Sequence, residues 1–168
     1  ALAKSVGIKL CASARIQYEL DARVLMPTNL YGPGDNYHPE NSHVVASLVR
    51  KFCTAKMSKK AFVELWGTGQ ALREVMHADD LANAILHVAQ LSQDHFESIT
   101  TPRLPVLNAG TGEEYTIEEM AGIILKKIGY ECEIIFNNER EGVKRKLMDS
   151  SKLMNTGFKP AVQFEKGI

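Results

Sequence analysis

The stretch RVLMPTNLYGP, residues 23–33, decides the fold class of this chain. Its first four residues form a short apolar run typical of a buried strand, and Pro27 ends that run. The residues from Thr28 to Pro39 are rich in Gly, Pro, Asn and Asp, which predicts a loop. In α/β folds, loops at the carboxyl ends of parallel strands bind ligands. A ligand-binding loop and a plain turn are therefore the two interpretations of this segment.

Helical and extended patterns alternate along the rest of the chain. Apolar residues at three- and four-residue spacing indicate helices, and short apolar runs between turn residues indicate strands. We predict helices over residues 1–20, from Ser42, from Asp79 or Asp80, after a capping box at Thr116 and Glu119, and from Ser150 or Ser151. We predict strands over residues 62–66, 74–77, 104–108 and 131–136. This alternation predicts the α/β class.

The composition is that of an ordinary globular domain. The chain has 168 residues, of which 45% are hydrophobic and 24% are charged. Basic and acidic residues number 20 each, which argues against a nucleic-acid partner, and no apolar run is long enough to span a membrane. The cysteines are widely spaced and form no C-x-x-C pair, so we expect no disulfide framework, no metal site and a cytoplasmic location. These cysteines are Cys11, Cys53 and Cys132.

Two features indicate that the chain is a piece of a longer protein. A helical pattern is present at residue 1 without a preceding cap residue, and another begins near residue 165. A dinucleotide-binding half normally carries G-x-G-x-x-G, but the turns at residues 67–69 and 110–112 both lack the third glycine. We interpret both as plain turns, and we expect the N-terminal, glycine-rich cofactor half to be absent from this chain.

Lys4 and His43 are the first candidates for chemistry. A tyrosine immediately before Ala1 would complete Y-x-x-x-K, which places an ammonium group one helical turn from a phenol. Taken alone, Lys4 is more simply a solvated lysine. His43 lies in the first turn of a predicted helix, where an imidazole is able to take and return protons. A capping or surface histidine is the alternative interpretation.

The remaining candidates are an aromatic residue and several cations. Trp66 suits stacking on a base or sugar, and the planar guanidinium of Arg73 suits a pyrophosphate. The basic run KRK at residues 144–146 also suits a diphosphate. A core tryptophan, a surface salt bridge and a solvated charge run are the corresponding structural alternatives.

The order of these motifs resembles the GDP-L-fucose synthase family of extended short-chain reductases. The chain carries AxAKxxGxKL from residue 1, MPTNLYGPxDN(aromatic)HPxNSHV from residue 26, WGTGxxxRExxHxDD from residue 66, NxGTG from residue 108 and RKLxD from residue 145. The similarity extends over essentially the whole chain. The part from Asp35 to Val44 is most particular to this family, whereas RExxHxDD is shared more widely among nucleotide-sugar epimerases.

The resemblance implies a fold, a reaction and an assembly. The fold would be the C-terminal part of a Rossmann-like reductase with its smaller substrate-binding domain. Residues 1–30 would end the dinucleotide-binding domain, residues 31–168 would mostly bind the GDP-sugar, and residues 77–110 would return to the Rossmann sheet. Members epimerise C3 and C5 of GDP-4-keto-6-deoxy-D-mannose and reduce C4 with NADPH. They commonly form homodimers through the helix that carries the counterpart of Lys4.

The resemblance also implies roles for individual residues. Lys4 matches the catalytic lysine and His43 the acid of the epimerisation, and both would contact NADP(H). The segment beside the nicotinamide is matched by Pro27, Thr28, Asn29 and Leu30. Contacts to the GDP-sugar are matched by Lys51, Trp66, Arg73 and Lys146, with Glu141 a weaker candidate. No metal is implied. We expect the side chains of Lys4, His43, Arg73 and Lys146 to line one cleft.

The departures from the family pattern limit what this chain does alone. The family's catalytic tyrosine, its serine and its epimerising cysteine would all precede Ala1, so we expect the 168 residues by themselves to be inactive. The loop between Asn137 and Lys146 is slightly shorter than is usual in the family. Two rival interpretations remain open. One is an NAD-dependent epimerase or dehydratase acting on a UDP- or dTDP-sugar, and the other is a non-catalytic nucleotide-sugar-binding relative.

Overall fold

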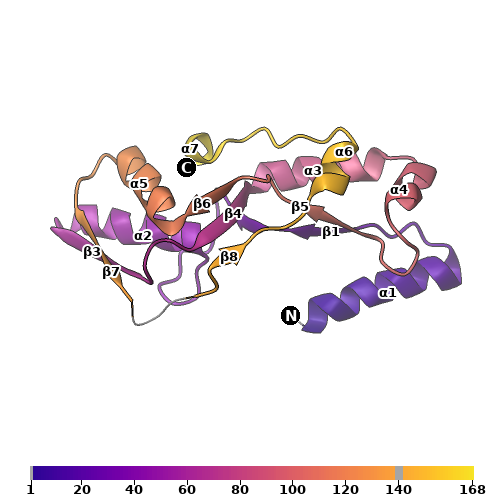
Figure 1. The fold of residues 1–168 in the computed structure, drawn as a ribbon, viewed down its shortest axis with the longest axis horizontal. Coiled ribbons are helices and arrows are strands. Elements are labelled where there is room, and N and C mark those ends of the chain that lie inside the picture. The colour runs from indigo at the N-terminus through magenta and orange to yellow at the C-terminus, as the bar shows by residue number, and fades with distance from the viewer. Residues whose placement is uncertain (1, 139–141) are drawn as a thin grey trace.

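The computed structural model describes residues 2–138 and 142–168. The chain forms an elongated α/β structure with short sheets, one of which, β3 with β7, lies at one end (Figure 1). In chain order, the elements are α1 (Leu2–Tyr18), β1 (Val24–Pro27), β2 (Asn29–Tyr31), α2 (Val44–Met57), β3 (Phe62–Trp66), β4 (Leu72–His77), α3 (Ala78–Gln90), α4 (Gln93–Ile99), β5 (Val106–Ala109), β6 (Glu114–Thr116), α5 (Ile117–Ile128), β7 (Glu133–Asn137), β8 (Arg145–Lys146), α6 (Ser151–Asn155) and α7 (Phe164–Gly167).

The strands form three groups, most of whose pairs are parallel. β1 pairs with β5, and β3 pairs with β7, in both cases in parallel. β4 is central to the third group, because it pairs in parallel with β2 and β8 and antiparallel with β6. Parallel strands joined by helices are the arrangement that the alternating sequence pattern predicts, so the α/β prediction is confirmed.

Two hydrophobic cores lie on either side of β4. One is formed by α2, β3, α5, β7 and α7, which gather at one end of Figure 1, and has Phe52 and Ile124 at its centre. The other lies among α3, α4, β5 and α6 at the opposite end, around Phe96 and Leu107. The strand β4 contributes Val75 to the first core and Met76 to the second, because successive side chains of a strand point to opposite faces.

The predicted capping box begins α5. Thr116 accepts a hydrogen bond from the backbone N–H of Glu119, whose carboxylate accepts one from the backbone N–H of Thr116. Gly129 ends the helix in the left-handed conformation, at φ 63°. The apolar side of α5 packs on α2, as its periodicity predicts.

The beginnings of two other helices differ from the predictions. His43, and not Ser42, is the N-cap of α2, so its imidazole lies just before the first turn. His77, and not Asp79 or Asp80, is the N-cap of α3. Histidine is an uncommon cap, but His77 Nδ1 accepts the hydrogen bond from the backbone N–H of Asp79 that a serine or aspartate oxygen would otherwise accept.

Long-range pairing produces several elements that the local sequence did not predict. The segment from Thr28 to Pro39 is not all loop, because residues 29–31 form β2 and pair with residues 75–77 of β4. The short strands β6 and β8 also pair with β4. The helix α4 was not predicted either, although its start is local: the Ser92 hydroxyl accepts a hydrogen bond from the backbone N–H of His95.

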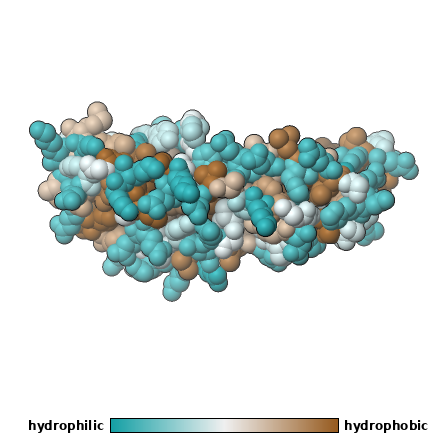
Figure 2. Space-filling model, turned by 90° about the horizontal axis from the view of Figure 1, so that it is seen from above, coloured by the Kyte–Doolittle hydropathy of each residue, from teal (hydrophilic) through white to brown (hydrophobic). Residues whose placement is uncertain are grey.

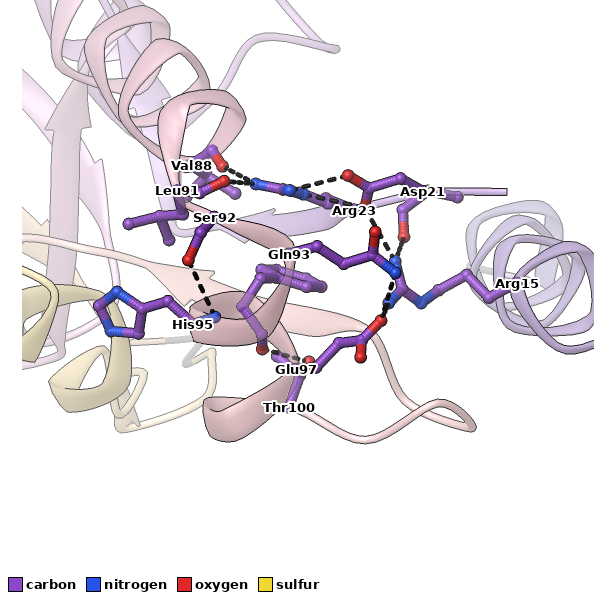
Figure 3. A network of polar contacts seen from close by, with 12 residues as sticks. Arg15, Asp21, Arg23, Val88, Leu91, Ser92, Gln93, His95, Glu97 and Thr100 are labelled. Carbon is purple, nitrogen blue, oxygen red and sulfur yellow. Dashed lines mark hydrogen bonds and ion pairs between the residues drawn. The ribbon is translucent and has the colours of Figure 1, made fainter. Parts of the chain in front are cut away.

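The helix α1 contributes only Ala12 as a fully buried residue, and a polar network fastens its C-terminal end (Figure 3). Arg15 bonds to Asp21 at 3.0 Å and to Glu97 of α4 at 2.7 Å. Arg23 bonds to Asp21 and to the last carbonyls of α3. Both guanidinium groups also lie over the ring of Phe96, at 5.5 and 5.2 Å from its centre.

The outer surface is of mixed polarity. Figure 2 shows hydrophilic and hydrophobic residues interspersed along the face seen from above. Among the helices of the described residues, none is both long enough and apolar enough to cross a membrane.

Candidate functional site

A cleft of about 950 Å³ brings together segments that are far apart in the sequence. We call it the central cleft. Its walls come from α1, β1, β2, the loop at Asp35, the N-cap of α2, and the end of β8 with the two residues that follow it. The lining residues that bear on the sequence analysis are Lys4, Pro27, Thr28, Asn29, Leu30, His43 and Lys146. Seven predicted site residues therefore lie around one space.

Lys4 enters the central cleft from α1. Gly7, Ile8 and Cys11 line the cleft from the same helix, which is the three- and four-residue spacing of a single helical face. Lys4 is exposed, so its ammonium group is accessible to a ligand. Because Gly7 has no side chain, it leaves space in the cleft beside Lys4.

The segment from Pro27 to Leu30 forms the floor of the cleft where β1 passes into β2. Thr28 Oγ1 donates to the carbonyl of Glu74 at 3.1 Å, and Asn29 Nδ2 donates to the same carbonyl at 3.4 Å. The backbone N–H of Thr28 donates to the carbonyl of Ala109 at 2.9 Å. These bonds attach the floor of the cleft to β4 and β5. The side chains of Thr28 and Asn29 thus hold the floor in place.

His43 lies at the wall of the cleft that α2 forms. Its backbone is extended, at φ −72° and ψ 167°, and its carbonyl accepts the N–H of Ser47 at 2.8 Å. The imidazole makes no capping hydrogen bond and is exposed. The residue therefore begins the helix with its backbone alone, and its ring nitrogens make no capping bond within the part of the chain that the structure describes.

The residues of the basic run at 144–146 make different contacts. Arg145 forms an ion pair of 2.5 Å with Glu114, and this hydrogen bond holds the pKa of the Glu114 carboxyl below its usual range. Lys146 lines the central cleft. Arg73 pairs with Lys146 across β4 and β8, but it is not among the lining residues and donates to the carbonyl of Leu72 at 2.7 Å. The expected convergence thus holds for three of the four side chains.

Lys51 and Trp66 form a separate cluster outside the lining of the central cleft. The ammonium of Lys51 lies 5.5 Å from the centre of the Trp66 ring and donates to the carbonyl of Glu64 at 2.9 Å. Burial lowers the pKa of Lys51, because it disfavours the charged form. Trp66 is 62% exposed, so it is not a core tryptophan. Glu141 lies outside the described residues.

The widely shared motif RExxHxDD is mostly structural here. Glu74 is fully buried and accepts hydrogen bonds from the backbone N–H groups of Gly112 and Met148, at 2.8 and 3.3 Å. A side chain at Gly110 would overlap the Glu74 carboxylate. The turn at residues 110–112 therefore encloses a carboxylate of its own chain, in agreement with its interpretation as a plain turn. Asp80 in the same way accepts from the N–H groups of residues 161 and 162.

A model of the NAD dependent epimerase/dehydratase family matches residues 1–100 of the chain. The chain belongs to this family. Its sequence is 45% identical to that of a probable GDP-L-fucose synthase of Oryza sativa subsp. japonica. It is 43% identical to that of the GDP-L-fucose synthase of Escherichia coli (strain K12). Both matches cover 100% of this chain but only 49% and 53% of the relatives. The chain thus spans about half the length of the curated relatives it matches.

Solved structures of family relatives have the same fold. A GDP-6-OMe-4-keto-L-xylo-heptose reductase from C. jejuni superposes with a TM-score of 0.85 at 29% identity, over 99% of this chain and 57% of that one. A GDP-mannoheptose C4 reductase from Campylobacter jejuni with NADP bound gives 0.78 at 30% identity, over 99% and 56%. UDP-glucose 4-epimerase of Thermotoga maritima, at 24% identity and a TM-score of 0.78, shares the fold alone.

Two ionisable side chains of the cleft were not among the site residues predicted from the sequence of this family member. Cys11 and Asp35 line the central cleft with Lys4 and His43. Asp35 lies in the stretch most particular to the resembled family, so the stretch itself was a signal. The spacing of that stretch, however, did not indicate which of its polar residues turns inward. Among the described residues, no cluster of three or more His, Cys, Asp or Glu side chains could hold a metal ion.

Proposed function

We propose that the protein to which this chain belongs is a GDP-L-fucose synthase. It would epimerise C3 and C5 of GDP-4-keto-6-deoxy-D-mannose and reduce C4 with NADPH. The central cleft carries the proposal, because it holds a histidine and two lysines beside the floor from Pro27 to Leu30. Identities of 43–45% to GDP-L-fucose synthases of two organisms over the whole chain support the choice of substrate.

His43 would act as the acid of the epimerisation. The ketone at C4 acidifies the protons at C3 and C5, so a base can remove each proton and an acid can return one to the opposite face. By the resemblance, the base is a cysteine outside these residues. An imidazole suits the acid, because it gains and loses a proton near neutral pH. The absence of a capping bond from its ring leaves the His43 side chain free for this transfer.

Lys4 would serve the reduction and hold the cofactor. The cleft suits the nicotinamide end of NADP(H): Lys4 offers hydrogen bonds to a ribose, while Val24, Met26 and Leu30 offer apolar surface to a flat ring. When bound, the cofactor supplies a hydride to C4. The Lys4 ammonium would lower the pKa of a neighbouring tyrosine, which then protonates the C4 oxygen.

The cations away from the reacting ring would hold the GDP moiety. Lys146 and Arg73 occupy adjacent strands, so their positive charges suit the two phosphates. Trp66 has an exposed ring for stacking on a base, with Lys51 beside it. Glu141 stays a weaker candidate. Binding these remote parts would position the sugar at His43 and Lys4.

The proposal extends to domains, assembly and location. Residues 1–30 and 77–110 would belong to the Rossmann sheet, with most of the remaining chain binding substrate; the parallel pairing of β1 with β5 supports this division. A homodimer through α1 is supported by the exposed apolar side chains of Leu2, Val6 and Leu10. The free cysteines favour the cytoplasm.

NADPH oxidation by the purified protein that carries this chain tests the proposal. With GDP-4-keto-6-deoxy-D-mannose we expect turnover and a GDP-L-fucose product identified by NMR, and with the 168 residues alone we expect none. Turnover only of UDP- or dTDP-sugars would favour the related epimerase or dehydratase. Binding of nucleotide-sugars without turnover of any would favour the non-catalytic relative.

A further inference from the structure

Asp35 lines the central cleft and carries a buried carboxylate oxygen. Lys4 and His43 line the same cleft, and Asp35 also borders a smaller cavity of about 200 Å³ beside Tyr31. The Asp35 atom Oδ2 is shielded from solvent and has no hydrogen-bond donor among the described residues. Buried carboxylate oxygens nearly always accept hydrogen bonds, because removing them from water is costly. An oxygen of this kind at the wall of a binding cleft points to a donor carried by the ligand.

A tight turn fixes the backbone that carries this carboxylate. Pro33 and Gly34 occupy the central positions of a turn in which the N–H of Asp35 donates to the carbonyl of Gly32 at 3.3 Å. Gly34 has φ 80°, as the third residue of a type II turn requires. The other carboxylate oxygen, Oδ1, accepts the N–H of Asn36 at 2.6 Å. One oxygen is therefore anchored, and the second is buried without a donor among the described residues.

The loop that follows the turn brings Asp35 back toward α2. Asn36 Nδ2 donates to the carbonyl of Asn41 at 3.2 Å, and Asn36 Oδ1 accepts the N–H of His38 at 3.0 Å. These bonds close the loop between Asp35 and His43, so both residues reach the same cleft from its two ends. Over residues 2–138 and 142–168, no hydrogen bond joins the side chains of Asp35 and His43.

We propose that Asp35 is a further substrate-binding residue, whose Oδ2 accepts a hydrogen bond from a hydroxyl group of the bound sugar. The proposal rests on the proposed function. A carboxylate repels phosphate, so Asp35 belongs to the sugar end of the ligand, whereas Lys146 suits the diphosphate. A neutral O–H donor satisfies the buried oxygen without bringing a second charge into the cleft.

The substitution Asp35→Asn tests this role, because the amide keeps the shape of the side chain and an acceptor for the N–H of Asn36. In the protein that carries this chain, we expect the KM for GDP-4-keto-6-deoxy-D-mannose to rise about ten- to hundred-fold, the range for losing a hydrogen bond to a charged group. The KM for NADPH should not change. The substitution Glu40→Gln removes an exposed carboxylate of the same loop and should change neither constant.

Thermal unfolding separates a binding role from a structural one. Without ligand, D35N should unfold at the same temperature as the wild type or higher, because a buried carboxylate oxygen without a donor destabilises the unliganded protein. The stabilisation by added GDP-sugar should be smaller in D35N than in the wild type. A merely structural aspartate would give a lower unfolding temperature without ligand.

The remaining outcomes are also decisive. If D35N raises the KM for NADPH instead, the donor is the nicotinamide carboxamide and the sugar assignment is wrong. If it lowers kcat and shifts its pH profile with both KM values unchanged, Asp35 acts through His43 and the proposal is overturned. Unchanged constants in an active wild-type background also overturn it. A wild type without activity on this substrate would instead reject the proposed function.

Discussion

Two histidines begin helices in this molecule, and they differ in how fully the fold uses them. His77 caps α3, is 6% exposed, and packs edge-on against the Tyr31 ring with 5.3 Å between ring centres. His43 caps α2 with its backbone alone, and its exposed ring borders the central cleft. The same residue type at the same kind of position therefore serves stability in one place and remains available for chemistry in the other.

The contrast extends to the carboxylates beside them. Glu74 and Asp80 are buried, and both oxygens of each accept backbone N–H groups from distant segments. Asp35 has one oxygen anchored and one without a donor among the described residues. A polar side chain whose hydrogen bonds are complete within the fold is structural, and one with capacity left over in a cleft is a candidate for ligand binding.

The largest effect is expected from His43→Ala. Removing the proposed acid should lower kcat for GDP-L-fucose formation about 10²- to 10⁴-fold, the usual contribution of a general acid, while the unfolding temperature stays unchanged. Steady-state kinetics and calorimetry measure the two. His95→Ala removes an exposed histidine of α4 as a matched control. A large loss of stability in H43A would show that the two histidines do not differ as the structure indicates.

The next effect is expected from Glu74→Gln. The amide replaces one accepting oxygen with a donor that faces the backbone N–H of Gly112 or Met148. We expect the free energy of unfolding to fall by about 1.5–3 kcal/mol, the range for hydrogen bonds to charged groups. Urea denaturation measures this change, with the exposed Glu131→Gln as the control. An equal loss in both variants would mean that burial of Glu74 is not the cause.

His77→Ala should have a similar or smaller effect, and on stability alone. The variant loses the cap of α3 and the edge contact with Tyr31, each of which contributes about 1 kcal/mol. The free energy of unfolding should therefore fall by about 2 kcal/mol, whereas H43A should leave it unchanged. If H77A and H43A lowered the free energy of unfolding equally, the lack of a capping bond at the His43 ring would not indicate a functional role.

Much of the fold could be predicted from local patterns, and the exceptions have physical causes. The helix α5 carried both periodicity and a capping box, and its start was predicted correctly at Thr116. The strand β2 was missed because its residues become extended by pairing with β4, about 45 positions later in the chain. The caps at His43 and His77 were missed because capping preference favours Ser and Asp, and tertiary contacts override it.

The candidate site was less accessible to local patterns than the fold. Lys4, His43 and Lys146 come from α1, the start of α2 and β8, and only the order of motifs connected them. Sequence order could not indicate that Arg73 would bond to its neighbouring carbonyl instead of lining the cleft. The free oxygen of Asp35 depends on a turn and a loop closure that no single residue determines.

The smallest effect concerns Asp21, which lies in the network of Figure 3 that fastens α1. Hydrogen bonds from Arg23 and then Arg15 hold the pKa of its carboxyl below the usual value of 3.8. The carboxylate therefore stabilises the folded state above that value, and this contribution is lost as the pH falls through the lowered pKa. Near pH 7, Asp21→Asn should lower the free energy of unfolding by less than about 1 kcal/mol, because the group is largely exposed.

Calorimetry from pH 7 down to about pH 3 measures this dependence. The difference between wild type and D21N should shrink as the wild-type carboxylate takes up its proton. A difference that stays constant with pH would mean that charge contributes nothing and that the side chain acts through its shape. The helix α1 also carries Lys4, which lines the central cleft. A loss of NADPH affinity in D21N would therefore show that the structural Asp21 positions the ligand-binding Lys4.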